Sequence, residues 1–178
     1  VQYQQQQQLL PVMLSASRYY QQCLRSHSAA IDYLKGRGIS GETAKHFELG
    51  YAPEGFQHLQ SGLKLNGTQT QQAVTNGLMI QKESGRAYAR FRDRLMFPIR
   101  NRKGDVIGFG GRILGEGQPK YLNSPETPLF HKGRELYGLY QLLKSHRNIE
   151  RIIVVEGYMD VVSLYQHGID YAVATLGT

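Results

Sequence analysis

Two carboxylates near the end of the chain stand where chemistry could be done. Glu156 directly follows the apolar run 152–155, and Asp160 lies one helical turn later. Open α/β sheets bind their ligands at the carboxyl ends of their strands, so a charged side chain at position 156 has little structural reason to be there. A carboxylate at such an edge can therefore serve in ligand binding. Asp160 is within reach of the same edge, but an acid in the first turn also stabilises a helix by itself.

The elements that would position Glu156 are a strand, a helix and a second strand. Residues 152–155 form a continuous β-branched run, which predicts a strand buried on both faces. Residues 158, 161, 162 and 165 repeat with helical spacing, and Gly168 stands where a left-handed residue would end the helix. Residues 171–176 are a second apolar run. Two parallel strands joined by a helix, in a right-handed crossover, are the predicted arrangement.

The positive charge of the chain is confined to its middle. The formal net charge is +7, and between Arg86 and Arg134 there are eleven Lys or Arg against four Asp or Glu. Outside this segment, cations and acids balance. A charge concentrated in this way indicates a polyanionic partner such as a nucleic acid. A solvated basic surface with no ligand is the simpler alternative.

Within this segment, three arginines recur with a period of two. If residues 88–95 form one strand, Arg90, Arg92 and Arg94 share one face, and we predict that they contact phosphates. The alternative is an edge strand whose charges prevent aggregation.

Two further groups in the basic segment suggest contact with a nucleic acid. Gly108, Gly110 and Gly111 lie inside a predicted strand, where they would let another backbone or a nucleic-acid strand approach closely, and Arg112 follows them. Lys120, Tyr121 and Asn123 offer a cation, a ring for stacking and an amide within a short irregular stretch, a usable set for single strands.

The beginning of the chain is predicted to be mainly helical. Residues 1–10 are rich in glutamine and lack a clear apolar face, which is typical of a linker that frays into a helix. Helical spacing follows over 12–24, 29–35 and 42–47, and Ser40 is the expected N-cap of the third helix. Farther on, the turn signal at 101–105 predicts a β-hairpin.

Several long motifs resemble DnaG-type bacterial DNA primases. The resemblance covers residues 30–178 and keeps the order of motifs in that family. The motifs on which the resemblance rests are Arg94-Leu-Met-Phe-Pro-Ile-Arg100, Ile107-Gly-Phe-Gly-Gly-Arg112, Lys120-Tyr-Leu-Asn-Ser-Pro-Glu-Thr127, Phe130-His-Lys-Gly-Arg-Glu-Leu-Tyr137 and Val154-Val-Glu-Gly-Tyr-Met-Asp160. The last of these looks like the first half of a TOPRIM domain, the metal-dependent fold that primases share with topoisomerases and some nucleases.

The resemblance implies roles for individual residues. Glu156 matches the catalytic glutamate of the family, as metal ligand or general base, and Asp160 is a weaker candidate ligand. By resemblance, Arg112, Lys120, Asn123 and Lys132 would bind the template or a nucleotide, and Arg37 is a weak candidate. Charge, spacing and side-chain type add Arg90, Arg92, Arg94, Tyr121 and Arg134 to these candidates. For Arg37, an ordinary basic residue at the end of a helix is an equally good interpretation.

The resemblance also implies cofactors and partners. Mg²⁺ or Mn²⁺ would act in the full enzyme, whose further acids, an Asp-x-Asp pair, are expected beyond Thr178; the 178-residue chain alone is therefore expected to bind nucleic acid without catalysis. Zinc is expected only in a module upstream of this part, because the single Cys23 offers no zinc-ligand set. Single-stranded DNA and ribonucleoside triphosphates are the implied ligands, and the replicative helicase and single-strand binding protein would engage other regions.

The expected fold class is α+β, with a helical lead-in, a mixed α/β basic subdomain and the first βαβ unit of a TOPRIM (Rossmann-like) domain. We place the basic subdomain at 1–131, with 1–50 mainly helical, and the incomplete TOPRIM domain at 132–178. No run approaches the ~20 apolar residues of a membrane span, so no membrane partner is expected and a bacterial cytoplasm fits.

The leading hypothesis is part of a DNA primase, which makes short RNA primers on single-stranded DNA. Two alternatives stay open at this point: a non-catalytic single-strand-binding replication adaptor, and another TOPRIM enzyme such as a nuclease or topoisomerase.

Overall fold

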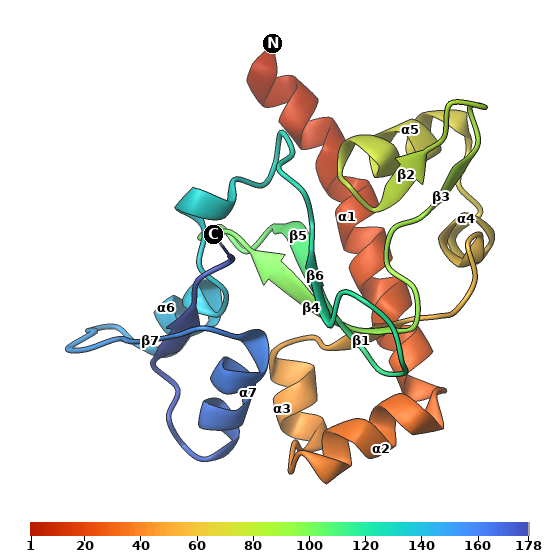
Figure 1. Cartoon of the computed structure of the whole chain (residues 1–178). Coiled ribbons are helices and arrows are strands. Elements are labelled where there is room, and N and C mark those ends of the chain that lie inside the picture. Colours follow the sequence, from red (N-terminus) through yellow and green to blue (C-terminus); the bar gives the residue numbers. More distant parts are fainter. Residues whose placement is uncertain (178) are drawn as a thin grey trace.

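The computed structural model describes residues 1–177 (Figure 1). The helices are α1 (Gln2–Arg25), α2 (Ser28–Gly36), α3 (Gly41–His46), α4 (His58–Leu63), α5 (Gly67–Thr75), the 3-10 helix η1 (Lys132–Arg134), α6 (Leu139–Ser145) and α7 (Tyr158–Gln166). The strands are β1 (Gly50–Ala52), β2 (Met79–Gln81), β3 (Ala87–Ala89), β4 (Arg94–Arg100), β5 (Val106–Ile113), β6 (Tyr121–Asn123), β7 (Ile153–Val155) and β8 (Ala172–Ala174).

An antiparallel sheet in the order β1-β4-β5-β6 forms the centre of the molecule. β4 and β5 are the predicted hairpin, paired from Arg94 opposite Ile113 to Arg100 opposite Val106. Pro98 lies in the part of β4 beyond the reach of β1, which pairs only with residues 94–96. At this position β4 has a neighbouring strand on one side only, β5. Proline has no N–H, and on the open side none is needed, which is typical of prolines at a sheet edge.

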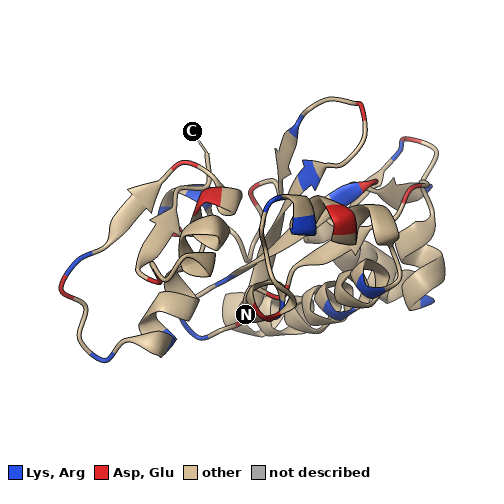
Figure 2. Cartoon of the chain, turned by 90° about the horizontal axis from the view of Figure 1, so that it is seen from below, with Lys and Arg blue, Asp and Glu red and all other residues tan. Residues whose placement is uncertain are grey.

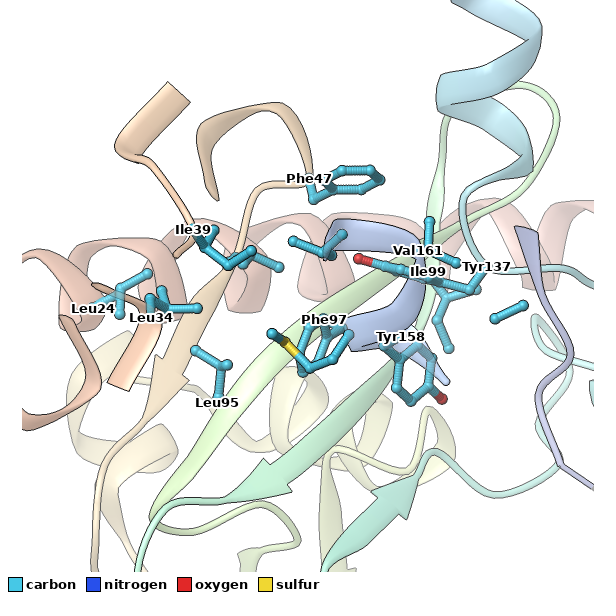
Figure 3. Packing of buried hydrophobic residues seen from close by; sticks show 14 of the residues in the cluster. Leu24, Leu34, Ile39, Phe47, Leu95, Phe97, Ile99, Tyr137, Tyr158 and Val161 are labelled. Carbon is cyan, nitrogen blue, oxygen red and sulfur yellow. The ribbon is translucent and has the colours of Figure 1, made fainter. Parts of the chain in front are cut away.

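Helices cover both faces of this sheet, because side chains of β4 alternate between two cores. Leu95, Phe97 and Ile99 enter a cluster with residues of α2, α3 and α7, whereas Met96 enters a cluster with residues of α1, α4 and α5. Figure 3 shows the first cluster, in which the ring of Phe97 lies beside that of Tyr158 with their centroids 5.2 Å apart. The sheet thus joins the helical lead-in to the C-terminal part of the chain.

The glutamine-rich start is helical, so its prediction as a linker is wrong. Helix α1 runs through it, and two long-range hydrogen bonds tie it to the rest of the fold. Asn76 donates its Nδ2–H to the carbonyl of Leu9 at 3.0 Å, and Gln6 donates its Nε2–H to the carbonyl of Pro128 at 2.9 Å. Glutamine has a favourable helix propensity, and tertiary contacts such as these stabilise the helix that it forms.

The strand–helix–strand unit at the C-terminal side is confirmed. β7 and β8 pair in parallel, α7 lies between them in sequence, and Gly168 follows the helix with φ of +88°. The prediction that the first strand is buried on both faces is wrong: Val154 is 61% exposed. Helices α6 and α7 both contact β8, and within residues 1–177 β7 pairs only with β8.

The predicted α+β class, with its helical lead-in, mixed subdomain and βαβ unit, agrees with these elements. Ser40 caps α3 by accepting the N–H of Thr43 at 3.2 Å, as predicted. Across residues 1–177, no helix is both long enough and apolar enough to cross a lipid bilayer.

His58 makes the stability of this fold depend on pH. Its Nε2–H donates to the carbonyl of Phe91 at 2.7 Å, and its Nδ1 lies 3.2 Å from the hydroxyl of Tyr19. Burial lowers the pKa of His58 below its ordinary value of 6.5. The folded state therefore keeps the ring neutral, while the unfolded chain binds a proton below about pH 6.5. Stability falls as the pH drops from that value toward the folded pKa.

We expect His58→Gln to weaken this loss of stability in acid, by at most about 1.4 kcal/mol per pH unit for one proton. Urea unfolding at about pH 7.5 and 5.5 measures the difference in the free energy of unfolding between the two pH values. His46 keeps a residual slope, because burial lowers its pKa too. His167→Gln, at an exposed position after α7, is the control. Equal pH dependence in the two variants would contradict the role of His58.

Candidate nucleic-acid interface

Glu156 lies where the sequence places it, directly after β7 and before α7, with its side chain exposed. Because β7 and β8 are parallel, their carboxyl ends meet at one edge, and Glu156 stands at that edge. Asp160 accepts the N–H of Gly157 at 3.1 Å, so one of its oxygens caps α7. The helix-stabilising interpretation of Asp160 is therefore confirmed, and its share in a metal site stays a prediction.

The carboxylates at this edge do not form a complete metal site. Within the described part of the chain, no group of three or more His, Cys, Asp or Glu side chains lies close enough to hold an ion. Divalent ions that act in phosphoryl transfer need several oxygen ligands. Glu156 can supply one of these ligands. The residues present would need further oxygen ligands to hold the ion.

The three arginines of period two do not share one strand face, so this part of the prediction is wrong. β3 ends at Ala89, and β4 begins only at Arg94. Between them Asp93 has a left-handed backbone with φ of +49°, which interrupts the extended chain. Figure 2, in which Lys and Arg are blue, shows cations on strands, loops and helices alike.

Two of these arginines are bound to the main chain of neighbouring strands. Arg90 donates to the carbonyl of Asn123 at 2.9 Å, and Arg94, only 4% exposed, donates to the carbonyl of Gly111 at 3.2 Å. Burial lowers the pKa of both guanidinium groups, which nevertheless stay charged at neutral pH. Contact of these two residues with a nucleic acid stays a prediction, and Arg94 has little surface available for it.

Arg92 stacks on an exposed ring. Its guanidinium lies 4.4 Å from the ring centroid of Phe56 and donates to the carbonyl of Ala89 at 2.6 Å. Phe56 is 56% exposed. A half-buried cation on an exposed aromatic ring leaves both groups partly open to solvent, and the predicted phosphate contact of Arg92 is still untested.

The fold brings three of the predicted residues together with an aromatic residue that the sequence analysis did not single out. The guanidinium of Arg112 lies 4.7 Å from the centroid of Tyr33 in α2 and 5.9 Å from that of Tyr121. Arg37 lies 5.4 Å from the same Tyr33 ring. Arg112 and Tyr121 are direct cross-strand partners on β5 and β6, and the exposed Lys120 precedes Tyr121. We call these five residues the Tyr33 surface.

The signal for Tyr33 was present in the sequence. Tyr33 and Arg37 are spaced i, i+4 at the end of a helix, which places their side chains next to each other. The contact with Arg112 had no such local signal, because 79 positions separate it from Tyr33 along the chain.

The glycines of β5 admit protein side chains, and this corrects the expectation that a backbone or a nucleic-acid strand approaches them. A Cβ atom at Gly108 would lie 3.1 Å from the ring of Phe130. At Gly110 it would lie 2.3 Å from the ring of Tyr158, closer than real Cβ atoms come. The bare strand thus accommodates aromatic rings from later parts of the chain.

Asn123 joins the Tyr33 surface to the edge where Glu156 stands. Its Nδ2–H donates to the carbonyl of Leu176, just after β8, at 3.0 Å. Its Oδ1 accepts the hydroxyl of Tyr158, the first residue of α7. Burial raises the pKa of Tyr158, so this hydroxyl keeps its proton to donate. Asn123 therefore fixes β6 relative to the parallel unit, in addition to its predicted contact with a nucleotide.

Lys132 and Arg134 lie in the short 3-10 helix η1. The N–H of Lys132 donates to Glu126 at 2.8 Å, which lowers the pKa of that carboxyl, and His131 lies 3.2 Å from the same group. Arg134 is exposed and Lys132 is half-buried. The contacts of Glu126 with residues 131 and 132 position the start of η1, and the predicted contact of Lys132 and Arg134 with nucleic acid stays a prediction.

The comparisons with known families match the chain in two parts. The model of the DNA primase catalytic core, N-terminal domain, matches residues 19–143, and that of the Toprim domain matches residues 150–178. The DNA primase of Pseudomonas putida is 58% identical over 174 residues, and that of Escherichia coli K12 is 49% identical over 176 residues. These alignments cover 96% and 98% of this chain but only 26% and 30% of the relatives, so the chain spans less than a third of their length.

Solved structures give the same result. The DnaG primase catalytic domain bound to single-stranded DNA is 48% identical and superposes with a TM-score of 0.92, over 98% of this chain and 57% of that one. A DNA primase domain from Pseudomonas aeruginosa is 52% identical with a TM-score of 0.92, over 96% of this chain and 54% of that one. The chain belongs to the DnaG family of bacterial DNA primases, to which its sequence motifs, its fold and its matches over nearly the whole length all assign it.

Proposed function

We propose that this chain is the template-binding part of a primase that makes short RNA primers on single-stranded DNA. The observation that carries this proposal is the Tyr33 surface, in which cations alternate with aromatic rings. Cations attract phosphates and rings stack on bases, a combination suited to single strands of any sequence. Through Asn123, this surface adjoins the edge at which Glu156 stands.

The comparisons support the same ligand. One of the structural relatives, at 48% identity, is a catalytic domain bound to single-stranded DNA. The excess of eleven cations over four acids between Arg86 and Arg134 is the electrostatic complement of such a ligand. Ribonucleoside triphosphates are the second ligand we propose, near Arg112, Lys120 and Asn123.

For the chemistry, we propose that Glu156 acts together with acids outside this chain. Magnesium or manganese, when held there, would neutralise the triphosphate charge and activate the attacking hydroxyl. Because no group of three potential metal ligands occurs among residues 1–177, we propose that the 178-residue chain binds template but makes no primer. Zinc, the replicative helicase and single-strand binding protein belong, in this proposal, to other parts of a primase in the bacterial cytoplasm.

Primer synthesis on a single-stranded template tests this proposal. Labelled ribonucleotides and magnesium are supplied to the 178-residue chain and to a longer natural chain that contains it. We expect both to bind template and only the longer one to make primers. Primer synthesis by the short chain would refute its predicted inactivity. A longer chain that binds template without making primers would favour the replication adaptor.

The salt dependence of template binding tests the surface itself. We expect Lys120→Gln to reduce the slope of log affinity against log salt by about 0.7, the value for one phosphate contact on a single strand. Fluorescence anisotropy of a labelled oligonucleotide over a range of salt concentrations gives the slope. Lys64→Gln, at an exposed position after α4, is the matched control. A slope equal to that of the control would remove Lys120 from the contact surface.

A further inference from the structure

A second candidate site lies where the ends of α1, α2 and α3 meet. A cavity of about 450 Å³ opens there, a volume typical of sites for small molecules. Its wall is mainly aliphatic and includes Leu24, Ile31, Leu34, Ile39, Ala44 and Leu49. Figure 3 shows Leu24, Leu34 and Ile39 together at one end of the buried cluster. None of the residues predicted for nucleic-acid binding lines this cavity.

The rim of the cavity is positively charged. Arg25, Lys35 and Lys45 line it with exposed side chains, and none of the three forms an ion pair within residues 1–177. Glu48 is the one acid among the lining residues, and its carboxylate is bonded to Arg100. The electrostatic potential at the mouth therefore favours an anion.

The lining excludes a nucleic acid as the natural occupant. No aromatic ring belongs to it, so bases would have nothing on which to stack. Free phosphate has no apolar part to cover the aliphatic wall, and an apolar cation would be repelled by the rim. An apolar body with a single anionic group satisfies both the wall and the rim.

We propose that this cavity binds a small apolar monocarboxylate. The hydrocarbon or ring system lies against Leu34, Ile39 and Leu49, and the carboxylate stays near the mouth, close to Lys35 and Lys45. Such a site is separate from the Tyr33 surface, and its occupancy can be tested without any activity of the enzyme.

Methyl NMR of the 178-residue chain provides a local readout. Decanoate is titrated as the probe, with decanol and decylamine as comparators that keep the apolar body and change the head group. We expect saturable shifts of the Ile31 and Ile39 methyl signals with decanoate, weaker ones with decanol and none with decylamine. Ile153, exposed on β7, reports non-specific adsorption and is expected not to shift. Equal responses to decanoate and decylamine, or shifts at Ile153 as large as those at Ile39, would overturn the proposal.

Charge reversal tests the rim. The double substitution Lys35→Glu and Lys45→Glu should weaken decanoate binding about tenfold, because each change replaces an attraction by a repulsion at an exposed position. Lys103→Glu with Arg147→Glu is the control of equal charge, at exposed loop positions outside the cavity. Equal affinities of the two double variants would overturn the proposal.

A filling substitution guards against the case in which the charge-reversed chain does not fold. Ala44→Trp occupies the cavity from its half-buried wall and leaves the rim charges in place. We expect it to abolish the decanoate shifts at Ile31 and Ile39. Unchanged shifts in this variant would place the ligand elsewhere and overturn the proposal.

Discussion

Glu156→Gln, in a longer natural chain that includes these residues, is expected to reduce primer synthesis by about 10²- to 10⁴-fold, the range for losing an acid–base group. Glutamine keeps the size of the side chain but neither carries the negative charge nor accepts a proton. Because the side chain of Glu156 is exposed, stability should change by less than about 0.5 kcal/mol. Incorporation of labelled ribonucleotides gives the activity, and urea unfolding gives the stability.

A comparison with Asp160→Asn distinguishes the roles of the two carboxylates. Asparagine can still accept the N–H of Gly157, so this variant keeps the cap of α7. If Asp160 serves only the helix, primer synthesis survives in Asp160→Asn and is lost in Glu156→Gln. Template affinity is expected to be unchanged in both. Full activity of Glu156→Gln would remove this residue from the chemistry.

Gly110→Ala is expected to destabilise the 178-residue chain by about 2–3 kcal/mol, the upper part of the range for overpacking a core. The added methyl group would lie 2.3 Å from the ring of Tyr158. That ring cannot move aside freely, since Phe97 stacks on it at 5.2 Å and Tyr137 meets its edge at 4.9 Å. Its hydroxyl is also bonded to Asn123. Urea unfolding followed by tyrosine fluorescence measures the loss.

Two further variants show whether the cost comes from this contact. Gly67→Ala should change stability little, because the added methyl would have no atom within 4 Å from other parts of residues 1–177, beyond its chain neighbours and its own helix backbone. In a Tyr158→Leu background, Gly110→Ala should cost less than it does alone, because the two sites are in contact. Additive effects of the two substitutions would contradict the packing explanation.

The sequence was sufficient to predict those parts of the structure whose conformation is decided by residues close together in the chain. The apolar run before Glu156, the helical spacing after it and Gly168 together predicted the βαβ unit and the place of the carboxylate. The turn signal at 101–105 predicted the β4–β5 hairpin in the same way. In each case neighbouring residues decide the conformation, since period and turn chemistry act over a few positions.

The sequence was insufficient where distant residues or a single backbone angle decide. Arg90 and Arg94 fit a period of two, but the left-handed backbone at Asp93 separates them. The Tyr33 surface forms only because β5 and β6 bring Arg112 and Tyr121 next to α2. The exposure of Val154 could not be read from its β-branched neighbours either, because burial depends on which elements cover a strand.

The long first helix has a consequence for how the chain is made. The apolar side of α1 is completed by residues much later in the chain; for example, the ring of Tyr20 meets that of Phe109 edge-on at 5.3 Å. A ribosome adds about 5–20 residues per second, so α1 leaves it roughly 4–18 s before its partner in β5 does. During that interval Val12, Met13 and Tyr20 lack the part of their cover that β5 supplies, although all three are buried in the finished fold. Nascent chains of this protein should therefore bind chaperones through α1 until β5 has been synthesised.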